Sequence, residues 1–60
     1  MSYLMFAPNV NDAFNPGAMY RISALTAFLI NDAGEQCARV LYSDGTFGIV
    51  TTKSITVEEA

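Results

Sequence analysis

Histidine and tryptophan are missing from this 60-residue sequence, and cysteine occurs once, at Cys37. Histidine is the commonest general base and the commonest metal ligand in proteins, so its absence removes the usual route to both kinds of site. One cysteine cannot form an intrachain disulfide or complete a zinc site. We therefore expect no metal, no cofactor and no enzymatic activity. We interpret Cys37 as a small buried or half-buried hydrophobic residue.

Basic residues are also scarce. The three bases Arg21, Arg39 and Lys53 face six acids, which gives a net charge of −3. Nucleic-acid-binding proteins usually carry clustered Lys and Arg, whereas these three are scattered along the chain. Among the carboxylates, Asp32 and Asp44 belong to turns, which leaves no pair for acid and base catalysis. We expect no nucleic-acid partner.

Long hydrophobic runs are absent too. The longest apolar stretch, residues 18–30, contains Arg21 and is too short to cross a membrane. Residues 1–7 are apolar but lack the basic n-region and the hydrophobic length of a signal peptide. A lone free cysteine is typical of a reducing compartment. These features predict a cytoplasmic protein with no membrane partner.

The small size of the chain predicts self-association. A 60-residue domain buries only about 60% of the surface that its unfolded chain exposes, so its stability margin is thin. Neither a disulfide nor a metal can reinforce this chain, but 52% of its residues are hydrophobic. We expect one domain over residues 1–60, with 1–17 as an N-terminal arm and loop, that forms a homo-oligomer.

The pattern that is present most clearly is a β-hairpin. Asp44-Gly45 lies between two runs rich in β-branched and aromatic residues, which indicates a two-residue type I′ turn. Such a turn pairs Tyr42 with Phe47 and Val40 with Ile49. These four side chains then share one face, and the opposite face is mixed. We interpret Gly48, which would face Leu41, as leaving room for a bulky neighbour or another backbone.

A second turn is predicted upstream. Residues 32–34 fit a three-residue hairpin loop in which Gly34 is left-handed and Asn31 pairs with Glu35. This places Phe28 beside Ala38, on the same face as the first hairpin. The predicted core is therefore Phe28, Val40, Tyr42, Phe47 and Ile49.

Residues 16–31 have an alternative interpretation as a helix. Asn15 is a good N-cap, Pro16 suits the first helical position, and Gly34 can end the helix. The apolar stripe would be Met19, Ile22, Leu25 and Leu29. That version is an α+β fold with one helix on a three-stranded antiparallel sheet. We favour strand over 24–31, because the two turns were placed independently and agree.

The two ends of the chain complete this pattern. Residues 2–7 predict a short strand or an apolar arm, and Pro8 ends it. Because proline cannot donate a hydrogen bond to a sheet, we expect this strand to lie at a sheet edge or to cross to a neighbouring chain. In the loop that follows, we interpret Phe14 as covering the edge of the core rather than as a partner-binding residue. After a break at Lys53-Ser54, residues 55–58 alternate in the manner of a last short strand.

From Leu25 onward, the order of predicted elements is a meander with tight turns, a short break and a final strand. This order resembles small barrels of the Src-homology-3 and Tudor kind. The residues that carry the resemblance are 38–41, before the Asp44-Gly45 turn, and 47–50, after it. We predict an all-β fold, either a small antiparallel meander or a five-stranded Src-homology-3-like barrel. The aromatic ligand cage of that family does not transfer, because Tyr42 and Phe47 are assigned to the core.

The second face of the predicted sheet is the main indication of function. It gathers Leu25, Ala27, Leu29, Cys37, Leu41 and Val50, with Arg39 as the only charge. A small antiparallel sheet normally leaves one face polar and wet, so an apolar second face predicts a contact. The candidate interface is Leu25, Leu29, Leu41, Arg39 and Val50.

We expect a non-enzymatic protein-interaction module. It would act as a homo-oligomer, or as an accessory or inhibitory protein that docks on a larger protein. Proteins of this kind are frequent in phages and mobile elements. Two alternatives stay open: a small enzyme with a site formed between protomers, and a structural component of a particle or fibre.

Overall fold

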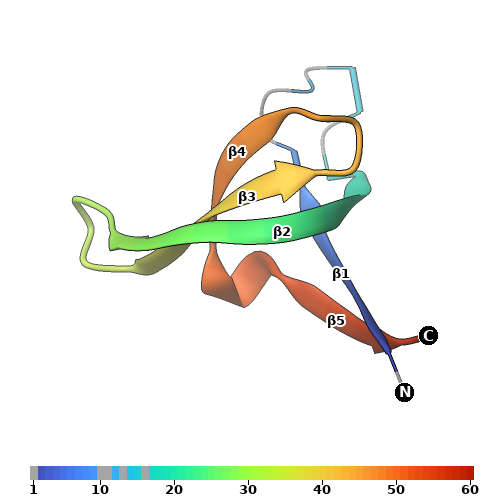
Figure 1. Ribbon diagram of the computed structural model, residues 1–60. Coiled ribbons are helices and arrows are strands. Elements are labelled where there is room, and N and C mark those ends of the chain that lie inside the picture. Colours follow the sequence, from blue (N-terminus) through green and yellow to red (C-terminus); the bar gives the residue numbers. More distant parts are fainter. Residues whose placement is uncertain (1, 10–11, 13, 16) are drawn as a thin grey trace.

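The computed structural model describes residues 2–9, 12, 14–15 and 17–60. They form an antiparallel sheet of five strands in the spatial order β4-β3-β2-β1-β5 (Figure 1). In chain order the elements are β1 (Tyr3–Pro8), β2 (Met19–Ile30), β3 (Gln36–Tyr42), β4 (Phe47–Thr51), the 3-10 helix η1 (Thr52–Ser54) and β5 (Thr56–Glu59). The prediction of an all-β antiparallel meander is confirmed.

The alternative helix over 16–31 is wrong. The segment Met19–Ile30 is one continuous strand of 12 residues. It contains Tyr, Phe, Thr and two Ile, β-branched and aromatic residues that fit a pleated surface. It also pairs with strands on both sides. Pro16, the predicted first helical residue, lies outside the described residues.

The sheet is strongly curled. β4 and β5 lie at its opposite edges, although residues 52–55 alone connect them. In a flat five-stranded sheet those edges would be roughly 19 Å apart, and a 3-10 turn advances only about 2 Å per residue. Figure 1 shows η1 leading the chain from the end of β4 to β5, which lies beside β1. The sheet stays open, so the predicted order of elements is present without closure into a barrel.

The core lies on the inner face of this curl. Val40 and Tyr42 are its largest fully buried side chains, as predicted. Phe28, Phe47 and Ile49 were assigned to the core wrongly, because they are 72%, 45% and 53% exposed. The buried cluster is completed by smaller residues and one isoleucine, and four half-buried side chains pack against it. The cluster is Ala7, Ile22, Ala38, Val40, Tyr42 and Val50, and the packed residues are Met5, Tyr20, Leu25 and Ile55.

The turn between β3 and β4 explains why Phe47 and Ile49 were wrongly assigned to the core. The Tyr42 N–H donates to the Thr46 carbonyl at 2.8 Å, and the Gly45 N–H donates to the Tyr42 carbonyl at 3.0 Å. The loop therefore has three residues, 43–45, rather than two. Gly45 has φ +91°, while Asp44, like every described non-glycine residue, has negative φ. A type I′ turn needs positive φ at both central residues, so it does not form.

One extra loop residue shifts the β3–β4 register by one position. Phe47 faces Leu41, and Ile49 faces Arg39. Because side chains alternate between the faces of a strand, a shift of one residue moves a whole set to the other side. Phe47 and Ile49 therefore lie on the outer face, opposite the face that holds Tyr42.

The β2–β3 turn was predicted correctly. The Asn31 N–H donates to the Glu35 carbonyl at 3.0 Å, and Gly34 has φ +81°. Phe28 does face Ala38. Its ring is nevertheless exposed, because β1 pairs with β2 only between Met19 and Ile22 and leaves the end of this hairpin uncovered.

Two irregularities in β2 change the pairing further along. The register shifts between Leu25 and Ala27 and again between Ile22 and Ala24. Leu25 therefore faces Val40, and Ile22 faces Tyr42. Bulges of this kind bend a strand and increase its twist, which fits the curl of the sheet. Residues 19–30 contain no glycine or proline that would have indicated these two irregularities.

The N-terminal predictions need two corrections. β1 is not an edge strand, because it lies between β2 and β5 and pairs with both. Its pairing with β5 ends at Phe6, so Pro8 interrupts no pair on that side. Phe14 does not cover the core: its side chain is 95% exposed.

Candidate functional site

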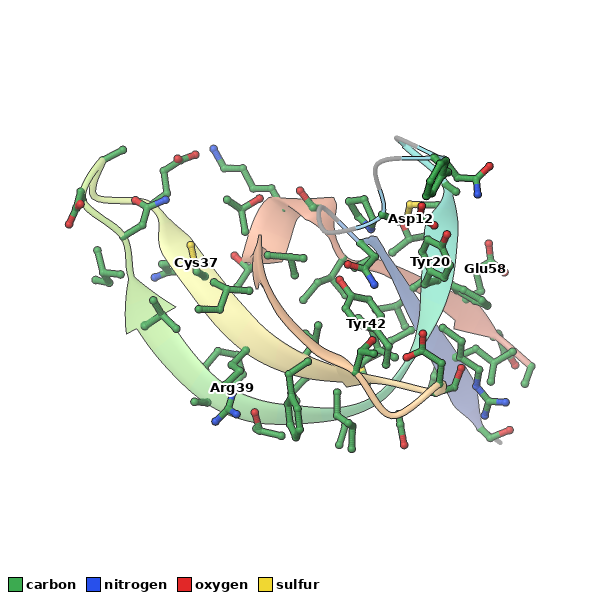
Figure 2. All side chains as sticks on the ribbon, turned by 90° about the horizontal axis from the view of Figure 1, so that it is seen from above. Asp12, Tyr20, Cys37, Arg39, Tyr42 and Glu58 are labelled. Carbon is green, nitrogen blue, oxygen red and sulfur yellow. The ribbon has the colours of Figure 1, made fainter. Side chains whose placement is uncertain are left out.

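The outer face of β2, β3 and β4 carries a set of neighbouring apolar side chains around one cation. We call this set the outer patch, and it consists of Leu29, Arg39, Leu41, Phe47 and Ile49. Leu41 lies directly opposite Phe47, and Arg39 lies directly opposite Ile49. Figure 2 shows Tyr42 inside the curl of the sheet and Arg39 on its other side.

The outer patch is open to solvent. Phe47, Ile49 and Leu29 are 45%, 53% and 37% exposed. The Arg39 guanidinium carbon lies 4.4 Å from the centroid of the Phe47 ring, which is a cation–π contact worth about 0.5–1 kcal/mol at an exposed site. Arg39 is the one charged member of the patch, and an apolar surface with a cation near an aromatic ring is suited to binding another protein.

The structure divides the predicted interface between the two faces. Leu29, Arg39 and Leu41 lie together on the outer face, as expected. Leu25 faces Val40 and Val50 faces Ala38, so both belong to the inner face. Val50 is 5% exposed.

Sequence reasoning missed Phe47 and Ile49 as surface residues. The two-residue turn placed them with Tyr42. The signal that could have found them is Gly45 as the left-handed residue of a three-residue loop, the same arrangement that Gly34 has in the other hairpin.

A second group of polar side chains lies where β1 and β2 meet. The Tyr20 hydroxyl donates to an Asp12 carboxylate oxygen, and the Tyr42 hydroxyl donates to the Pro8 carbonyl at 2.6 Å. The Tyr20 and Tyr42 rings pack edge to face with centroids 6.2 Å apart. Figure 2 shows Asp12, Tyr20 and Tyr42 on the same side of the sheet.

The protonation of this group follows from its hydrogen bonds. The Tyr20 hydroxyl lowers the pKa of the Asp12 carboxyl, and the N–H groups of Phe14 and Asn15 lower it further. The same bond to Asp12 raises the pKa of Tyr20. For Tyr42, burial is the main cause of a raised pKa, with the charge of Asp44 second. These groups are held in their ordinary neutral-pH forms, which suits a structural role rather than proton transfer.

Asp12 organises the loop that carries Phe14. Its Oδ1 accepts the backbone N–H of Phe14 at 3.0 Å and that of Asn15 at 3.2 Å. An aspartate that accepts N–H groups two and three residues ahead stabilises a local turn. Phe14 is therefore an exposed aromatic residue in a turn that Asp12 stabilises, and it is not a member of the outer patch.

A hollow of about 330 Å³ lies between β1 and β2. Its polar lining comes from Arg21, Ser23 and Ser43, and Tyr3 and Met5 contribute apolar surface. Its described lining residues include one cation and no carboxylate or thiol.

Cys37 is buried, as predicted, at 3% exposure. Its thiol lies 3.6 Å from the Glu35 carbonyl. Among the described residues no three His, Cys, Asp or Glu side chains gather as a metal site would require. No helix in this part of the chain is long and apolar enough to cross a membrane.

The comparisons with known proteins add no relative. No protein-family model matches the chain, and no curated protein or solved structure is significantly similar to it.

Proposed function

We propose that this protein is a non-enzymatic protein-interaction module that binds through the outer patch. The observation that carries the proposal is the exposure of Phe47, Ile49 and Leu29 on a face whose single charge, Arg39, is held against an aromatic ring. Exposed large apolar side chains that are neighbours on one surface are typical of protein contacts. Aromatic residues and arginine are the types enriched at such contacts.

The chemistry of the remaining residues supports binding rather than catalysis. The sequence has no histidine, and the aspartates that accept most hydrogen bonds, Asp12 and Asp44, stabilise their own loops. The partner is a second copy of the chain, or a larger protein on which it acts as an accessory or inhibitor, in the manner of small phage and mobile-element proteins. We place this activity in the cytoplasm, where a lone thiol such as Cys37 persists.

The substitution Leu41→Glu tests the proposal. Leu41 is half-buried on β3, the middle strand of the outer patch, directly opposite Phe47, and an unpaired carboxylate in an apolar contact is costly. Association measured by sedimentation, and protein retained by an immobilised chain from a host lysate, are both expected to fall strongly. The thermal midpoint should move only a few degrees.

Val57→Glu is the matched control. Val57 is a 58% exposed apolar residue on β5, outside the outer patch, and the change in charge is the same. Association should persist in this variant. If Leu41→Glu keeps both its assembly state and its captured partners, the outer patch is not the binding surface and the proposal is wrong.

A further inference from the structure

The two edges of the sheet differ in how they are protected. β5, at one edge, carries Glu58 and Glu59, and charged side chains discourage pairing with another strand. β4, at the other edge, has no charged residue or proline between Thr46 and Thr52. Its pairing with β3 is regular from Phe47 to Thr51, so no bulge interrupts this edge. Among the residues that the structure describes, no strand pairs with this edge of β4, which leaves it open to another strand.

The ladder shows which backbone groups of β4 face outward. The Tyr42 N–H donates to the Thr46 carbonyl, so these two residues form a hydrogen-bonded pair. In an antiparallel ladder, hydrogen-bonded and non-hydrogen-bonded pairs alternate. Gly48 and Val50 therefore bond to β3, whereas the N–H and C=O groups of Phe47 and Ile49 point away from it. The side chains of those same two residues lie on the outer face.

We propose that a second copy of this chain pairs antiparallel with β4 about a two-fold axis at Ile49. This inference goes beyond the proposed function, because it names a partner for the β4 edge, whereas the proposed function concerns the outer patch beside that edge. Ile49 of one copy lies opposite Ile49 of the other, and Phe47 lies opposite Thr51. The outward backbone groups of each copy then find partners in the other, and the two outer patches become one continuous surface.

Charge complementarity favours a second copy over an unrelated strand. In this arrangement the end of β4 in one copy lies beside the beginning of β4 in the other. Lys53, which follows β4 in η1, therefore lies at the same end of the interface as Asp44, which is exposed in the 43–45 turn of the other copy. A two-fold axis repeats this opposite-charge contact at both ends of the interface. The chain has a net charge of −3, so two copies repel each other elsewhere. Two copies can therefore approach each other along the neutral β4 edge, where these two opposite-charge contacts form.

Disulfide crosslinking through Ile49→Cys tests the proposal directly. Residues in a hydrogen-bonded antiparallel pair have Cα atoms about 5.5 Å apart, within the range that a disulfide spans. Mild oxidation should convert most of this variant to a covalent dimer.

Phe47→Cys is the matched control, since it changes an exposed residue of the same strand and face. Its copies would be roughly 14 Å apart and should not crosslink. Cys37 is buried and does not compete.

Sedimentation of the unmodified chain completes the test. We expect a particle of twice the 6.5 kDa chain mass. Lys53→Glu should weaken dimerisation by roughly 2- to 30-fold, because two exposed ion pairs are lost. Arg21→Glu makes the same change of charge on β2, where residue 21 pairs with Phe6, and should leave the dimer intact.

Three results would overturn the β4 pairing. They are a monomer at all concentrations, equal crosslinking at positions 47 and 49, and equal effects of the two charge variants. A monomer leaves the proposed function standing if Leu41→Glu still abolishes binding of another protein. Equal crosslinking leaves it standing if Leu41→Glu still abolishes binding of another protein or of a differently arranged second copy. The proposed function fails separately, when Leu41→Glu changes no association at all.

Discussion

The ring of Tyr42 lies against the backbone of Gly48 on the neighbouring strand. A Cβ atom at residue 48 would lie 2.9 Å from Tyr42 Cε2 and 3.2 Å from Tyr42 Oη. The ring cannot move aside freely, because its hydroxyl is held by the Pro8 carbonyl at 2.6 Å. We predict that Gly48→Ala lowers the free energy of unfolding by about 1–3 kcal/mol, the usual cost of overpacking. Urea denaturation measures this loss.

The same substitution in a Tyr42→Leu background is the control. Leucine removes the ring atoms that approach residue 48, so the additional cost of Gly48→Ala should become small. A double-mutant cycle then gives a coupling energy between the two positions. An equal cost in both backgrounds would show that the Tyr42 ring is not what requires glycine here.

Tyr42→Phe tests the hydrogen bond that connects β3 to the end of β1. Tyr42 is 1% exposed, and its hydroxyl donates to the Pro8 carbonyl. Removing the donor leaves that carbonyl without this partner, and we predict a loss of about 1–2 kcal/mol in unfolding free energy. Tyr3→Phe is the control, because Tyr3 is 62% exposed, and it should change stability little. Similar values for the two variants would contradict the prediction.

Local patterns in the sequence predicted the elements but not their pairing. The β2–β3 loop was predicted in full, because Gly34 at the third position specifies a left-handed residue. Asp44-Gly45 satisfies two loop types that differ by one residue, and the choice decides whether Phe47 or Gly48 faces inward. Tyr42 resolves this choice in the structure, since its ring occupies space that only Gly48 leaves open. The bulky neighbour predicted for Gly48 is therefore Tyr42.

The candidate site was predicted in part for the same reason. Arg39 and Leu41 were assigned to the second face, and they lie there. Leu25 was misplaced by an irregularity in β2 that has no local sequence signal. Val50 was misplaced by the β3–β4 register. Long-range packing determines both features, and a single sequence does not show it.

Stability should fall in acid because of Asp12 and Asp44. The Tyr20 hydroxyl lowers the pKa of Asp12, and the Thr46 hydroxyl lowers that of Asp44, from the usual 3.8. A carboxyl whose pKa is lower in the folded state stabilises the fold fully above its unfolded pKa. That contribution is lost as the pH falls through the folded value. We therefore predict stability that is flat above about pH 5 and declines below pH 4.

Urea denaturation between pH 2 and pH 7 measures the acid decline. Asp12→Asn and Asp44→Asn each keep a side-chain oxygen that can accept hydrogen bonds, but they do not titrate. Each should make the decline shallower, and the double variant should flatten it most. Asp32→Asn is the control, because Asp32 is a third aspartate in a turn and is exposed. A decline that is unchanged in the double variant would assign the acid sensitivity to other carboxyls.

The two possible β3–β4 registers make different predictions for Val40→Thr and Ile49→Thr. A two-residue turn would place both residues on one buried face, so both substitutions would be costly. In the structure Val40 is fully buried and Ile49 is 53% exposed. Val40→Thr buries a hydroxyl and should cost about 1–3 kcal/mol, whereas Ile49→Thr should cost less than about 1 kcal/mol. Both changes keep a β-branched residue in the strand, so β-propensity is matched.

Urea denaturation of the two variants measures the two losses of unfolding free energy. Sedimentation confirms that both variants are compared in the same assembly state. Equal costs would support the two-residue turn and would return Ile49 to the core.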